Sequence, residues 1–218
     1  MSREKKCGIW FLLTSIICVV FIGCGGEEPS IRDPEITSKV EALFEDYSGE
    51  SPGAAVMVIE DGEVLFEGGF GLANIESGKP ITPQSAFRLA SVSKQFTAMA
   101  IMILSERGQL AYDDKLTQYL PELERFGDDI TIRHLLTHTG GLPDYYDALE
   151  EAAGDSMPDT EAAMEFLAGW GEPLFAAGDR YEYSNPGYEM LALVVARVSG
   201  QDFGRFLEDN IFTPLGMK

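Results

Sequence analysis

The alternation of apolar and polar residues divides the first part of the chain into one helical segment and two strands. Apolar residues recur at helical spacing through residues 34–47, which predicts an amphipathic helix. Two short apolar runs follow, separated by the Asp-Gly pair at 61–62. Because Asp-Gly between such runs favours a tight hairpin, we expect antiparallel strands at about 54–60 and 63–70.

The remainder of the chain has a helical pattern. A wide apolar face over residues 88–104, followed by Gly108, predicts a helix that is buried almost all round. Asn185 followed by Pro186 is typical of a helix N-cap with proline in the first turn. Further helices are expected at residues 131–137, 160–168, 185–200 and about 202–211. The pattern gives two strands and about six helices, and two strands alone are seldom a stable sheet.

The N-terminal segment has the composition of an export signal. Basic residues precede an apolar run from Gly8 to Ile22, which is short for a spanning helix and suited to a signal peptide. Its end resembles a bacterial lipoprotein signal, in which Cys24 is lipidated; an ordinary signal peptide or an anchor helix is the alternative. We therefore expect a signal peptide at 1–23, a flexible tether at 24–33 and one domain at 34–218. The protein would then be lipid-anchored in the bacterial cell envelope, on the outer side of the cytoplasmic membrane.

Charge and cysteine content narrow the possible partners. The chain has 16 Lys plus Arg against 36 Asp plus Glu, a net charge of -20. Phosphate backbones would be repelled, so we expect no nucleic-acid partner. Cys7 and Cys18 lie within the expected signal peptide, which leaves Cys24 alone and excludes a disulfide framework or a cysteine metal site.

The two histidines, His134 and His138, are four residues apart, as in some metal sites. No H-E-x-x-H carboxylate accompanies them, so we expect no metal. We expect them to support the loop at 140–141 instead.

Ser91 and Lys94 form an S-x-x-K pair at the start of an apolar helix. A serine hydroxyl needs a base to become a nucleophile, and a lysine three residues later on a helix lies on the same face. The motif alone is weak evidence, since Ser2 and Lys5 match it too. The structural alternative is a capping serine beside a lysine whose stem lies along the surface.

Tyr183-Ser184-Asn185 is the second candidate element. In a structural interpretation Asn185 caps a helix and Tyr183 packs. In a functional interpretation the phenolate of Tyr183 takes the proton of Ser91. Lowering a phenol pKa from ~10 to ~7 takes about 4 kcal/mol, much of which a protonated Lys94 could supply in a dry cleft.

Three ordered motifs, LASVSKQFTA, HLLTHTGGLPDYYD and YEYSNPGYEMLA, resemble the serine beta-lactamase and penicillin-binding-protein-like family. They are most similar to its class C beta-lactamase, D-alanyl-D-alanine carboxypeptidase and esterase branch. The resemblance implies an α+β, beta-lactamase-like fold over residues 34–218, without a cofactor. It implies a serine hydrolase that cleaves an amide or ester substrate through an acyl-serine intermediate.

The resemblance also assigns roles to residues. Ser91 would be the nucleophile and Lys94 its proton-shuttling partner. Tyr183 would be the general base and then the general acid, and Asn185 would hold Lys94 or the substrate amide. Ser93 would have no catalytic role and would cap or pack.

One part of the family pattern has no counterpart. The third motif, K-T-G or H-x-G, should follow Tyr183 on a strand that supplies the second oxyanion donor. His138-Thr139-Gly140 has the right letters, but it precedes Tyr183, so we reject it. We therefore expect the fold to lack the C-terminal strands of its sheet and the chain alone to be inactive or nearly so. The alternatives are a non-catalytic membrane-anchored binding module and an inactive truncated product.

Overall fold

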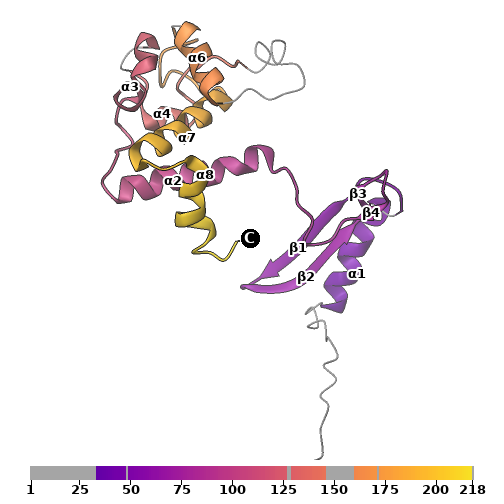
Figure 1. Cartoon of the computed structure of the whole chain (residues 1–218). Helices are drawn as coiled ribbons and strands as arrows, with labels where there is room; N and C mark the ends of the chain where they lie inside the picture. The colour runs from indigo at the N-terminus through magenta and orange to yellow at the C-terminus, as the bar shows by residue number, and fades with distance from the viewer. Residues whose placement is uncertain (1–32, 48, 127–128, 146–159, 171, 218) are drawn as a thin grey trace, which may run out of the picture. The chain divides into compact units, whose positions relative to one another are not determined.

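The structure is a computed structural model that describes residues 33–47, 49–126, 129–145, 160–170 and 172–217. The expected signal peptide, Cys24 and nearly all of the expected tether lie outside these residues. The described residues belong to two compact units, one ending at Phe87 and the other beginning at Arg88 (Figure 1).

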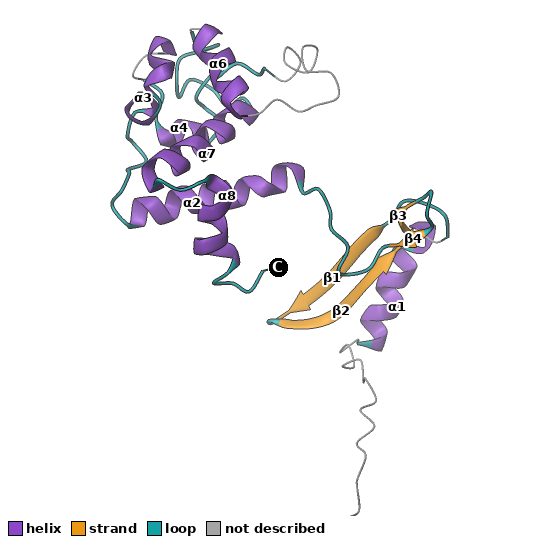
Figure 2. Cartoon of the chain, viewed as in Figure 1, coloured by secondary structure: helices purple, strands orange, loops and turns teal. Residues whose placement is uncertain are grey.

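The first unit contains a helix and a hairpin. Helix α1 (Pro34–Leu43) packs against β2 (Glu63–Phe70), which pairs antiparallel with β1 (Ala54–Glu60) (Figure 2). Asp61 and Gly62 have φ of 52° and 84°. Both central residues are left-handed, as a two-residue hairpin turn of the primed type requires. The predicted strands are confirmed to the residue, because turn chemistry fixed their register.

Two further strands in this unit were not expected. β3 (Leu72–Asn74) and β4 (Lys79–Pro80) form a second small antiparallel sheet. Strands of two and three residues are too short to show the alternation of apolar and polar residues that identifies a strand, so the sequence does not predict them. The core of the unit includes Phe66, which is buried and stacks on Phe70.

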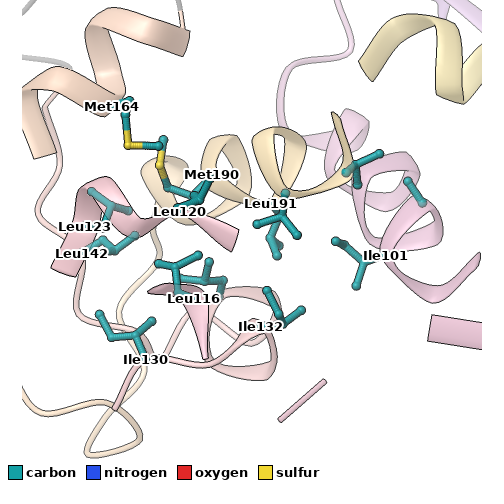
Figure 3. Close-up of a cluster of buried hydrophobic side chains, with 14 of the residues drawn as sticks. Ile101, Leu116, Leu120, Leu123, Ile130, Ile132, Leu142, Met164, Met190 and Leu191 are labelled. Carbon is teal, nitrogen blue, oxygen red and sulfur yellow. The ribbon is translucent and has the colours of Figure 1, made fainter. Parts of the chain in front are cut away.

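The second unit is helical. The α-helices among its described residues are α2 (Lys94–Glu106), α3 (Leu116–Tyr119), α4 (Ile132–Leu136), α6 (Thr160–Trp170), α7 (Asn185–Ser199) and α8 (Phe203–Leu207). Helix α7 packs against α2 and also contacts α4, α6 and α8. Figure 3 shows core side chains of this unit, from its helices and from the segments between them; Ile101 of α2 and Leu191 of α7, both labelled, have no exposed surface. The mixture of helices and small antiparallel sheets confirms the expected α+β class.

Most helix boundaries follow the sequence signals, but the burial of α2 does not. Ala100, Ile101 and Leu104 face the core, whereas Met99 and Met102 are 45% and 50% exposed. The expectation of a helix buried all round is therefore wrong. An apolar pattern shows which residues are able to be buried, and only the surrounding chain decides which of them are covered.

Among the described residues, none of the helices has both the length and the apolar character needed to cross a bilayer.

Candidate active site

Ser91 lies in the short turn that leads directly into α2. It belongs to a 3-10 turn, Ala90–Ser93, and Lys94 is the first residue of α2. In a 3-10 turn the side chains at i and i+3 are eclipsed, and Lys94 Nζ donates a hydrogen bond to Ser91 Oγ at 3.3 Å. Ala90 has a left-handed φ of 45°, an uncommon conformation for a residue with a side chain. Ser91 is exposed at the helix start.

Tyr183 reaches the same point from the segment that precedes α7. Its Oη lies 2.5 Å from Ser91 Oγ, and either oxygen is able to donate. The structure thus brings together the three groups that the sequence singled out, although Tyr183 is 92 residues from Ser91.

Asn185 binds Lys94 and does not cap α7 with its side chain. Its Oδ1 accepts a hydrogen bond from Lys94 Nζ at 2.8 Å. The N-cap is Ser184, whose Oγ accepts from the backbone N–H of Gly187 at 3.1 Å. The expectation of an Asn185 cap is therefore wrong by one residue. Because the serine satisfies the helix terminus, the amide of Asn185 is available to Lys94.

Electrostatics around Tyr183 favour its ionisation. Its pKa is lowered from the ordinary value, first by hydrogen bonding with Lys94 and then by the hydrogen bond with Ser91. Lys94 Nζ also lies 4.9 Å from the centre of the Tyr183 ring. The phenol is 45% exposed, however, so the expected dry cleft is not formed by the described residues. Water screens the ammonium and weakens its effect on the phenolate.

His138 is a part of the site that sequence reasoning missed. Its backbone O accepts from Glu182 N–H at 2.9 Å, and its Nδ1 accepts from Ser184 N–H at 3.1 Å. The residues on both sides of Tyr183 are thus bound to one histidine. The signal in the sequence was its place in the H-T-G-G motif, which does not say what the ring contacts.

His134 serves the structure elsewhere, because it completes a capping box with Thr131 at the start of α4. The expected role of the two histidines in supporting the loop at 140–141 holds only indirectly, through the bond from Thr139 N–H to His134 O. No group of three or more potential metal-binding side chains occurs among the described residues.

Glu189 is a second residue that was not anticipated. It lies one helical turn after Asn185 and lines an open pocket of about 360 Å³ together with Ser93 and Lys94. Burial, and after it the nearby carboxylate of Asp144, raise the pKa of Glu189 to about 7, although the charge of Lys94 opposes the shift. Ser93 itself is exposed and makes no capping bond, so it neither caps nor packs as expected.

Comparisons with known proteins agree with these features. A family model described as Beta-lactamase matches residues 40–218. A penicillin-binding protein of Bacillus subtilis is 37% identical over 82% of this chain and 40% of its own length. Esterase EstB of Burkholderia gladioli is 34% identical over 87% of this chain and 52% of its own length.

A solved structure shows the same likeness. The octameric penicillin-binding protein homologue of Pyrococcus abyssi superposes with a TM-score of 0.71 at 31% identity, over 84% of this chain and 43% of that one. The chain therefore spans about half, or less, of the length of these relatives.

Proposed function

Because the chain belongs to the beta-lactamase family, we propose that its site is that of a serine hydrolase, in which Ser91 attacks the carbonyl carbon of an amide or ester. The relative named an esterase supports this general kind of function. The observation that carries the proposal is that Tyr183 Oη and Lys94 Nζ both lie within hydrogen-bonding distance of Ser91 Oγ.

The geometry supports a proton transfer between the two oxygens. The Tyr183 phenolate takes the proton of Ser91 as Oγ bonds to the substrate carbonyl carbon, and the resulting phenol then protonates the leaving amine or alcohol. Lys94 stabilises the phenolate by its charge, and Asn185 holds Lys94 in place. The backbone N–H of Ser91 serves as one donor to the oxyanion. Water then releases the acyl group from Ser91.

Covalent labelling tests the proposal. A fluorophosphonate probe, which phosphonylates an activated serine with loss of fluoride, should add one adduct per chain in an intact-mass spectrum. Ser91→Ala should remove the adduct, whereas Ser93→Ala, the same change two residues away, should not. A non-catalytic binding module would remain unlabelled. Penicillin and a chromogenic ester, used next, separate beta-lactam from ester substrates.

Labelling is a better test than turnover for this chain. No K-T-G or H-x-G follows Tyr183 in the sequence to supply a second oxyanion donor. The lack of one such donor typically lowers a rate by ~10²–10³. Labelling by a reactive probe requires only one covalent step per chain, whereas steady hydrolysis requires repeated acylation and deacylation, so labelling is less affected by such a loss. We accordingly propose that the chain alone turns over substrate slowly or not at all.

We also propose that Cys24 is lipidated and anchors the protein to the outer side of the cytoplasmic membrane. The proposal rests on the sequence around Cys24 alone. Labelled palmitate should be incorporated by cells that express the protein, and Cys24→Ala should abolish the label and release the protein from membranes. Membrane retention of the Cys24→Ala chain would favour an anchor helix instead.

A further inference from the structure

His138 binds the chain on both sides of Tyr183. Its backbone O accepts from Glu182 N–H, and its Nδ1 accepts from Ser184 N–H. His138 has a left-handed φ of 56°, which is uncommon for a residue with a side chain. Because Nδ1 accepts a hydrogen bond, it carries no proton, and the imidazole is the neutral Nε2–H tautomer.

The imidazole also packs against the phenol that it positions. Ring centres of His138 and Tyr183 are 4.6 Å apart, and Tyr188 of α7 lies at 5.1 Å. Tyr181 contacts the ring edge to face at 5.9 Å. The charged group that acts on the imidazole is Lys94 of α2. Burial first, and then the charge of Lys94, hold the pKa of His138 below its ordinary value.

We propose that neutral His138 is a positioning residue that holds Tyr183 against Ser91 and Lys94, and that protonation of its ring releases Tyr183. The inference rests on the proposed function in one respect: the release of Tyr183 slows the reaction because Tyr183 is the proposed base for Ser91. A proton on Nδ1 would face the N–H of Ser184 across 3.1 Å, so the hydrogen bond would be replaced by two opposed donors. Tyr183 would lose one of its two neighbouring attachments.

The test compares substitutions at the two histidines of the chain. His138→Leu removes the acceptor at Nδ1, and His138→Asn restores one with Oδ1 and does not titrate. His134→Leu is the matched control, because His134 belongs to the capping box of α4 and takes no part in the hydrogen bonds that hold the chain beside Tyr183. Two quantities are measured across pH: the rate of labelling by the fluorophosphonate probe, and the ¹³Cζ chemical shift of Tyr183, assigned with Tyr183→Phe.

His138→Leu should slow labelling by roughly 10²-fold, the size expected for a displaced reacting group. It should also raise the pKa of Tyr183 toward that of a free phenol. His138→Asn should recover most of the rate and lack the acid-side inflection that the imidazole gives the wild-type profile. His134→Leu should leave both quantities at wild-type values in the folded fraction. Wild-type rate and Tyr183 pKa in a folded His138→Leu protein would overturn the proposal.

Two readouts keep the inference separate from the proposed function and from misfolding. If the wild-type chain does not label at all, the proposed function fails, yet the pKa of Tyr183 still decides the role of His138. If His138→Leu does not fold, the role of His138 is decided instead by the amide resonance of Ser184, followed across pH in the wild-type protein. Its shift should change as His138 titrates, and an unchanged resonance would contradict the proposal.

Discussion

Replacing Glu189 with glutamine should stabilise the protein above pH 7 and leave its stability unchanged near pH 4. Glu189 lies on α7 in the pocket beside Lys94, where burial and the neighbouring Asp144 raise its pKa from 4.5 to about 7. In the unfolded chain the carboxyl group ionises at its ordinary pKa. Glutamine has nearly the same shape and never ionises, so it removes only the titration.

The sign and size of the effect follow from proton linkage. Between pH 4.5 and 7 the folded protein holds a proton on Glu189 that the unfolded chain has released, so stability falls as pH rises through this window. The gap of about 2.5 units corresponds to an upper bound of about 3 kcal/mol. Because the carboxyl group is only partly buried and water relaxes around it, we expect ~1–2 kcal/mol at pH 8.

The measurement is urea unfolding followed by far-UV circular dichroism at several pH values from 4 to 9. The free-energy difference between Glu189→Gln and wild type should grow between pH 4.5 and 7 and then remain constant. Glu124→Gln, the same change at an exposed position, should show no such growth. A difference that is constant over the whole range would refute the desolvation of Glu189. A difference of opposite sign would show that Lys94 stabilises its ionised form.

Three further outcomes follow from the same structure. Ser184→Ala should destabilise the protein by about 1 kcal/mol in urea unfolding because α7 loses its N-cap, and Ser184→Thr should recover part of it; equal stabilities would place the cap elsewhere. Ile101→Ala should cost ~2–5 kcal/mol in the same assay, since Ile101 has no exposed surface, and a loss under 1 kcal/mol would contradict that burial. Tyr183→Phe should slow fluorophosphonate labelling by at least ~10²-fold while the circular dichroism is unchanged, and normal labelling would exclude Tyr183 as the base.

The elements that the sequence predicted well are those set by local chemistry. Asp61 and Gly62 fix the hairpin by their own backbone preferences, and the predicted strands match without error. The exposure of Met99 and Met102 on α2 was not predictable in this way. It depends on which segments cover the helix, and the periodicity of the helix itself is the same whether or not a cover is present.

The same distinction between local chemistry and tertiary packing applies to the candidate site. Contact between Ser91 and Lys94 followed from their spacing. The approach of Tyr183 was one of two interpretations that its residues left open, and the family resemblance favoured it, because no local signal places two residues 92 positions apart in contact. His138 and Glu189 were missed as parts of the site because their roles arise only when α4, α2 and α7 are packed together. A histidine in a turn and a glutamate on a helix have ordinary local explanations.

The N-cap of α7 is Ser184 and not Asn185 as expected, and this difference has a consequence for the chemistry of the site. If Asn185 were the cap, its Oδ1 would be occupied by a backbone N–H of the first turn, and Lys94 would lose its 2.8 Å partner. Lys94 would then keep its longer contact to Ser91 Oγ and its interaction with Tyr183, but it would lack the partner that orients it from α7. Ser184 has two roles in this arrangement. Its Oγ caps α7, which leaves the amide of Asn185 free to orient Lys94, and its N–H donates to His138, which fixes the backbone beside Tyr183. The ammonium and the phenol that serve Ser91 are therefore positioned by the same turn of the chain, and a change that displaces this turn should affect both groups at once.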